Sequence, residues 1–224
     1  MGEIQHQSIS IKKIFEEAIN LYKKYYREVI FIGILTSLYN IVDQEVFVKH
    51  IYKDSLALWS AFLMLSLVIT TIFYSAATWY IHNHLSGSHI SLADSFSQSL
   101  QRVVPVSVYI ILFDVMFFAG FVAFIIPGIF VDIIFSQAYY FVLLKGVGVR
   151  EAFSESRKVT KGNRLRIATI VGFSFLPYIL LLILFGQSLP VLGQQLLLII
   201  PASFEIVLRY VLWRSLTRIS LASE

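Results

Sequence analysis

Residues 145–166 read KGVGVREAFSESRKVTKGNRLR, and the sequence on either side of them is almost entirely apolar. This basic segment contains seven Lys and Arg residues. Its stretch GVREAF at 148–153 shares a pattern with SIKKIF at 10–15 and SLADSF at 91–96: a small residue, an aliphatic residue and mostly polar positions precede Phe. Each motif begins a short amphipathic stretch that leads into a long apolar one, which indicates a repeated architecture.

The composition indicates a chain whose main solvent is lipid. Of the 224 residues, 57% are hydrophobic and 14% are charged, whereas soluble domains contain about 25% charged residues. The net charge of +4 does not indicate a nucleic-acid partner, because the basic residues lie at the ends of apolar runs. The absence of cysteine excludes disulfides, thiol catalysis and thiolate metal sites.

Six apolar stretches approach the length of about 20 residues that a helix needs to cross the bilayer. They are residues 28–42, 56–81, 104–125, 128–144, 166–186 and 191–213. A tight turn at Ile126–Ile129 is expected between the third and the fourth, where Pro127 ends one helix and Gly128 supplies unusual backbone angles.

Charge asymmetry predicts the orientation. If the N-terminus is cytoplasmic, only Lys49 and Lys53 of the 18 Lys and Arg residues lie outside. The positive-inside rule therefore predicts that both termini are cytoplasmic. Several aromatic residues near the span ends are typical of interfacial belts: Tyr25, Tyr26, Trp59, Trp79, Tyr80 and Trp213.

The three motifs predict an all-α membrane fold in which six transmembrane helices form three parallel repeats. Each repeat consists of a cytoplasmic amphipathic helix and a helical hairpin, in units of about 8–82, 90–145 and 148–216 within one domain, 1–224. The units should be related by a pseudo-threefold axis along the membrane normal. The alternative is that amphipathic loops of any multi-span protein match by chance. Ser91 and Asp94 have the spacing of a capping box.

An ordered combination of motifs carries a family resemblance: FIIPGI at 124–129, Gly146, AFSES at 152–156 and KGN at 161–163. This combination resembles the YciC-type six-span bacterial inner-membrane proteins and the related membrane domain of some glycerophosphodiester phosphodiesterases. The resemblance implies a multi-pass protein of the bacterial cytoplasmic membrane. It supplies no catalytic residue to carry over, and the chain is too short to hold a phosphodiesterase barrel of about 250 residues as well.

Four ionisable residues form a candidate intramembrane polar site, since such residues are costly in lipid. Asp114 lies near the middle of the third span, either as a proton or cation site or as a structural hydrogen-bonded carboxyl. Asp132 lies one turn beyond Pro127, where the dipole of a helix N-terminus stabilises an anion. Glu205 and Arg209 have the spacing of a pair within one helix, with an anion or lipid headgroup site as the alternative.

The basic segment supplies the candidate contacts to anionic lipid headgroups: Arg150, Arg157, Lys158, Lys161, Arg164 and Arg166. The alternative is that these residues determine topology alone. His82, His84 and His89 cluster at the end of the second span, and their spacing favours interfacial solvation over a shared metal. We expect no catalytic, cofactor or metal site and no nucleic-acid partner.

Two functions fit these observations. The first is a non-enzymatic membrane module that contacts anionic phospholipid, or a membrane-protein partner, through its cytoplasmic basic amphipathic helices. The alternative is a small transporter or channel for a proton, an ion or an amphiphile that uses Asp114 and the Glu205/Arg209 pair.

Overall fold

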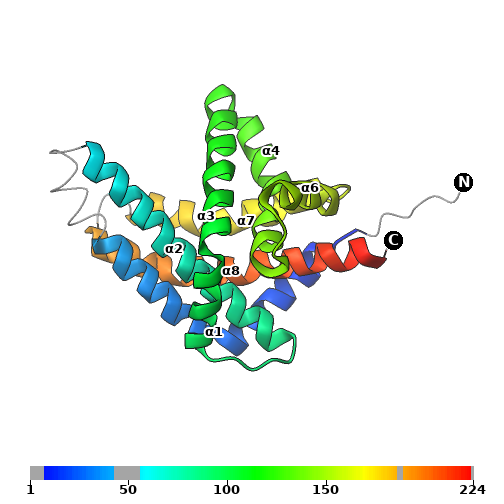
Figure 1. Ribbon diagram of the computed structural model, residues 1–224, viewed down its shortest axis with the longest axis horizontal. Coiled ribbons are helices and arrows are strands. Elements are labelled where there is room, and N and C mark those ends of the chain that lie inside the picture. The colour runs from blue at the N-terminus through cyan, green and yellow to red at the C-terminus, as the bar shows by residue number, and fades with distance from the viewer. Residues whose placement is uncertain (1–7, 43–55, 186–188, 223–224) are drawn as a thin grey trace, which may run out of the picture. The chain divides into compact units, whose positions relative to one another are not determined.

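The computed structural model describes residues 8–42, 56–185 and 189–222, and every regular element in these ranges is helical. This confirms the all-α class. The elements are α1 (Ile11–Val42), α2 (Leu56–Leu85), α3 (Leu92–Ala123), α4 (Ile125–Phe135), α5 (Ala138–Tyr140), the π-helical η2 (Phe141–Lys145), α6 (Val149–Thr160), α7 (Arg164–Phe185) and α8 (Val191–Ala222) (Figure 1).

Five helical stretches of the described chain are long and apolar enough to cross a membrane, which indicates a multi-pass membrane protein. They are Ser60–Leu85, Leu92–Ala123, Ile126–Lys145, Arg164–Phe185 and Leu192–Leu221. The first predicted span, residues 28–42, lies in α1 and is not among the five. The six-span arrangement therefore stays a prediction, and Lys49 and Lys53 lie outside the described residues.

The chain forms two compact units within the predicted single domain. Unit 1 combines residues 1–20, 104–173 and 208–224, and unit 2 combines residues 21–103 and 174–207. Segments that are distant in sequence therefore contribute to the interior of the same unit.

The three motif segments take different local forms. The first continues into the rest of α1, with non-helical angles at Tyr25 (φ −119°, ψ 19°). The second runs without a break into the apolar part of α3, across Pro105. The third is a separate helix, α6, because a turn with Gly162 at φ +84° divides it from α7. Gly is favoured there because this backbone conformation strains other residues.

The Phe of each motif makes an edge-to-face contact with a Phe of another helix, within its own unit. The ring-centroid distances and interplanar angles are 6.3 Å and 86° for Phe15–Phe173, 5.9 Å and 88° for Phe96–Phe73, and 5.4 Å and 90° for Phe153–Phe135. Such pairs contribute about 0.5–1.5 kcal/mol beyond the area that they bury. The motif Phe is thus a packing residue in all three places, although the repeat itself stays a prediction.

The capping box predicted at the start of α3 is confirmed. The backbone N–H of Asp94 donates to Ser91 Oγ at 3.1 Å, and the backbone N–H of Ser91 donates to Asp94 Oδ2 at 3.1 Å. Two backbone donors that the helix leaves without partners are satisfied reciprocally.

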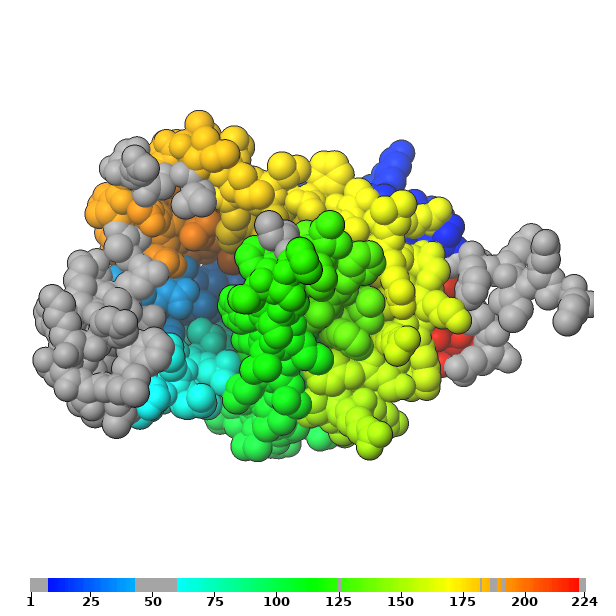
Figure 2. Space-filling view, turned by 90° about the horizontal axis from the view of Figure 1, so that it is seen from above, coloured from blue at the N-terminus to red at the C-terminus, as the bar shows by residue number. Residues whose placement is uncertain are grey.

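The α3–α4 hairpin forms as predicted, but its turn lies earlier than expected. Phe124 is the extended residue between the helices (φ −163°, ψ 142°), and Pro127 and Gly128 lie in the first turn of α4. Proline is tolerated there because its missing N–H has no helical acceptor. Gly128 does not have an unusual backbone angle; instead it lets α4 pack closely against α3. A Cβ on Gly128 would lie 3.0 Å from the backbone N of Phe121. Figure 2 shows this hairpin in green, facing the viewer.

Two predicted belt residues belong to the interiors of the units. Trp213 is 4% exposed in unit 1 and stacks on Tyr140 with 5.5 Å between ring centroids. Tyr80 is 8% exposed in unit 2 and contacts Tyr25 edge-to-face at 6.0 Å. The belt prediction is wrong for these aromatic residues, because neighbouring rings cover them.

Candidate functional site

The fourth span is interrupted in unit 1. α4 ends at Phe135, a turn at Ser136 and Gln137 follows, and the short α5 leads into the π-helical η2. The backbone N–H of Tyr140 donates to the carbonyl of Gln137. This hydrogen bond joins residues three apart in the sequence, whereas the α-helical bond joins residues four apart. Interrupted spans and π-helical turns are frequent where membrane proteins place functional polar groups.

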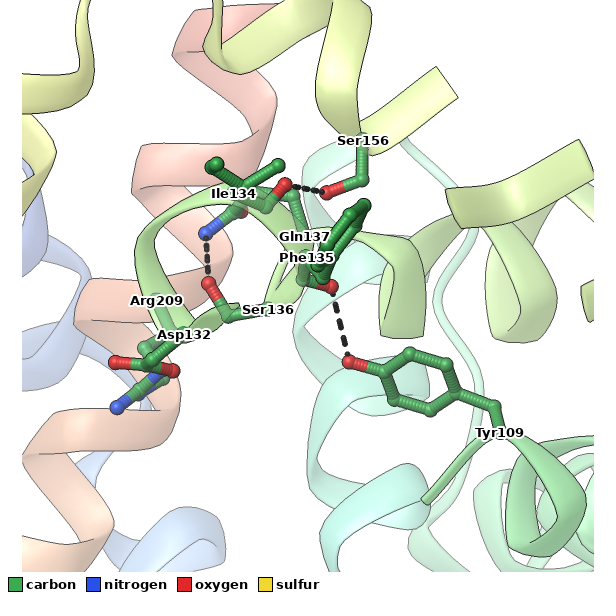
Figure 3. A network of polar contacts seen from close by, with 8 residues as sticks. All are labelled: Tyr109, Asp132, Ile134, Phe135, Ser136, Gln137, Ser156 and Arg209. Atoms are coloured by element: carbon green, nitrogen blue, oxygen red, sulfur yellow. Dashed lines mark hydrogen bonds and ion pairs between the residues drawn. The ribbon is translucent and has the colours of Figure 1, made fainter. Parts of the chain in front are cut away.

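Side chains of two other helices satisfy the carbonyls that precede the break (Figure 3). Ser156 of α6 donates from Oγ to the carbonyl oxygen of Ile134 at 2.7 Å, and Tyr109 of α3 donates from its hydroxyl to that of Phe135 at 3.1 Å. A buried carbonyl without a donor would cost about 1–3 kcal/mol. The break is therefore supported by tertiary contacts.

Two polar side chains occupy the break itself. Gln137 is 1% exposed and donates from Nε2 to Ser136 Oγ at 3.2 Å. Its other amide atom, Oε1, is buried and has no hydrogen-bond partner among the described residues. A buried acceptor of this kind is available to a donor from water or a ligand.

Asp132, two turns into α4, faces Arg209 of α8 (Figure 3). The Arg209 Nη1 to Asp132 Oδ1 distance is 3.5 Å, and the two side chains are 17% and 15% exposed. This separation describes an ion pair rather than a well-formed hydrogen bond. The prediction that the helix N-terminus stabilises Asp132 is corrected, because the helix begins at Ile125 and the countercharge comes from another helix.

Of the four predicted intramembrane residues, unit 1 brings Asp132 and Arg209 together. In unit 2, Glu205 accepts a hydrogen bond from the Tyr178 hydroxyl at 3.0 Å. Asp114 is half-buried on α3 and has no hydrogen-bond or ion-pair partner in the described part of the chain.

The basic helix α6 packs against α4 and α5 through its buried side chains, which are Ala152, Ser156, Val159 and Thr160. Phe153 contacts Tyr109 and Phe135, each with 5.4 Å between ring centroids. The remaining surface of α6 and the turn after it expose Arg150, Arg157, Lys158 and Lys161. Lys158 pairs with Glu155 at 2.6 Å. Arg164 and Arg166, the other predicted headgroup contacts, are half-buried.

The segment before α1 docks on the turn between α6 and α7. The backbone N–H of Ile9 donates to Asn163 Oδ1 at 3.0 Å, and its carbonyl accepts from Arg166 Nη1 at 2.6 Å. Beside this contact lies a shallow pocket of about 420 Å³, lined by Ser8, Ile9, Ser10, Ile11 and Arg166. Besides two isoleucines, the lining residues are two serines and an arginine, whose side chains are hydrogen-bond donors for an anionic group.

The histidines of unit 2 lie among aromatic rings. His84 contacts Tyr80, Tyr25 and His89 at centroid distances of 4.2, 5.5 and 5.3 Å. Among the described residues, no group of three or more His, Cys, Asp or Glu side chains is arranged to hold a metal ion.

Comparisons with known proteins found no match: no family model, no curated protein and no solved structure is similar to this chain. The resemblance to the YciC-type family therefore stays a prediction from the motifs.

Sequence reasoning missed Ser136, Gln137, Ser156 and Tyr109. A signal for the first two is present, because Ser and Gln stand side by side in the apolar run 129–144 together with Asp132. Polar residues at such a position indicate an interrupted span. Ser156 and Tyr109 carry no comparable signal, since their roles depend on which carbonyls lie opposite them.

Proposed function

We propose that this chain is a non-enzymatic membrane module whose basic helix α6 contacts anionic phospholipid headgroups at the cytoplasmic face. The observation that carries the proposal is the arrangement of α6. One face packs on α4 and α5, while Arg150, Arg157 and Lys161 are exposed. Each basic side chain near an anionic membrane surface contributes about 1 kcal/mol to binding.

The pocket beside Arg166 supports the same proposal. Its guanidinium and the hydroxyl-bearing residues Ser8 and Ser10 lie in the same unit as α6, next to the turn that ends it. A phosphate group accepts hydrogen bonds from guanidinium and hydroxyl groups alike. In the predicted topology this pocket and the exposed basic residues lie at one membrane surface.

The test measures, by native mass spectrometry, how much phosphatidylglycerol and how much phosphatidylcholine stay bound to the protein purified in mixed micelles. We expect wild type to prefer phosphatidylglycerol. The triple variant Arg150→Gln/Arg157→Gln/Lys161→Gln should lose at least tenfold of this preference at low salt, because three surface cations are removed. Lys158 is left unchanged because it pairs with Glu155.

The matched control removes three charges elsewhere, in Lys23→Gln/Lys24→Gln/Arg27→Gln, all exposed on α1. It should keep most of the preference. An equal loss in both triple variants would mean that the basic residues of α1 attract the lipid as strongly as those of α6, and wild type without any preference would contradict the proposal.

A second candidate function is a small transporter or channel for a proton, an ion or an amphiphile. The interrupted fourth span favours it, because the Asp132–Arg209 pair lies one helical turn before the break and the amide oxygen of Gln137, without a partner in the described chain, lies in it. Reconstituted vesicles would show a flux that Asp132→Asn or Arg209→Gln abolishes. Vesicles that pass no proton, potassium ion or labelled amphiphile would remove this candidate, and so would a flux that both variants retain.

A further inference from the structure

α3 is the least buried of the five candidate spans. In its most apolar window 17% of the residues are buried, compared with 24–56% in the other four. Exposure of apolar side chains to lipid is ordinary and requires no partner protein. A polar side chain on the same surface is different, because lipid offers it no hydrogen bond.

Asp114 is such a side chain. It lies near the middle of the apolar part of α3, it is half-exposed, and it has no hydrogen-bond or ion-pair partner among the described residues. An aspartate at the centre of a membrane helix costs about 2.5–3.5 kcal/mol on insertion scales, and such residues usually face protein or water. The described part of a single chain therefore leaves the Asp114 carboxyl without the hydrogen-bond partner that it needs in lipid.

A stripe of exposed residues runs along α3 through Asp114. Ile111, Asp114, Phe118 and Phe121 follow one another at spacings of three, four and three residues, and the three apolar members are 37%, 60% and 44% exposed. Alternating steps of three and four residues are those of the a and d positions in a seven-residue repeat, with which two parallel helices keep one seam in contact. Most helix pairs in membranes cross in this left-handed way.

We propose that two copies of this chain pair in the membrane through this seam, α3 against α3, with the two Asp114 carboxyl groups hydrogen-bonded to each other. Two copies inserted in the same orientation are related by a twofold axis along the membrane normal, so identical residues meet at the same depth. A protonated carboxyl donates to a second carboxyl, which makes Asp114 complementary to itself. The intramembrane cation Arg209 is engaged by Asp132 within unit 1.

Because the chain has no cysteine, single Cys variants test the seam directly. Ile111→Cys and Phe118→Cys place a thiol on the seam, whereas Leu112→Cys and Ala119→Cys place one on another exposed side of the same helix. After mild oxidation in native membranes, we expect the seam variants to run at twice the 25.6 kDa of the monomer on non-reducing gels. The two control variants should stay monomeric.

Substitution of Asp114 in the Phe118→Cys background tests the carboxyl pair. Asp114→Asn keeps both donor and acceptor and should cross-link as before, whereas Asp114→Leu should dimerise about tenfold more weakly. Circular dichroism of each variant shows whether the helices are retained. If Asp114→Leu does not fold, the cross-linking pattern of the four Cys variants that retain Asp114 still tests the interface.

Three outcomes would overturn the proposal. Equal cross-linking at all four positions would indicate random collision, and absence of cross-linking at both seam positions would exclude this interface. A cross-linked band of another mass would show that a different protein covers Asp114. The proposal is independent of lipid binding, which Asp114→Asn should leave unchanged.

Discussion

At the scale of single residues, the Asp132–Arg209 pair is the contact with the largest expected effect on stability. Removing one partner of a poorly solvated ion pair removes its attraction for the opposite charge and costs about 3–5 kcal/mol. At about 2–4 °C of Tm per kcal/mol for a chain of this size, Asp132→Asn should lower Tm by about 10 °C, measured by tryptophan fluorescence in detergent. Asp132→Asn/Arg209→Gln should recover part of the loss, because the double variant no longer places a guanidinium beside a neutral amide.

The exposed pair Lys12–Glu16 is the control. Its atoms lie 3.8 Å apart and its side chains are 85% and 58% exposed. Such helical pairs contribute about 0.3–0.5 kcal/mol, so Lys12→Gln should leave Tm nearly unchanged. If the losses from Asp132→Asn and Arg209→Gln simply add in the double variant, the two residues are not coupled.

At the scale of elements, the close approach of α3 and α4 depends on two glycines. A Cβ on Gly128 would meet backbone atoms of Phe121 at 3.0–3.1 Å, and a Cβ on Gly120 would meet the backbone of Gly128 at 3.0–3.2 Å. Backbone atoms cannot rotate away, so the helices must separate. We expect Gly128→Ala to destabilise the protein by about 1–3 kcal/mol, measured as a lower Tm.

Gly172→Ala is the matched control, because Gly172 also lies within a helix and a Cβ there would meet nothing within 4 Å. Alanine favours the helix over glycine by about 1 kcal/mol, so this variant should be neutral or slightly stabilised. Equal effects of the two substitutions would mean that the hairpin tolerates a wider separation.

At the scale of the whole molecule, the predicted orientation is testable by cysteine labelling. A Cys replacing Ser188, which lies outside the described residues, should react with an impermeant thiol reagent added to intact cells, because the predicted loop faces outward. The inner position is best probed at Ser154, which is exposed, rather than at Ser156, which is fully buried and hydrogen-bonded. Ser154→Cys should react after the cells are permeabilised and not before. The reverse labelling pattern would show that the topology is the opposite of the predicted one.

The sequence by itself determined the membrane class, the helical fold and the local signals. These depend on composition and on residues near one another in the chain, such as the long apolar runs and the Ser91–Asp94 capping box. The α3–α4 turn was predicted close to its place, but its Pro and Gly were given the wrong roles, because the reason for Gly128 is the backbone of another helix.

Only the tertiary structure decided which charges and carbonyls meet. Arg209 lies opposite Asp132, 77 positions earlier, and Ser156 and Tyr109 satisfy the carbonyls before the break in the fourth span. A helical pattern shows which side chains share a face, but the partner of that face depends on the packing of distant segments. The same reason explains why Trp213 is a core residue rather than a belt residue.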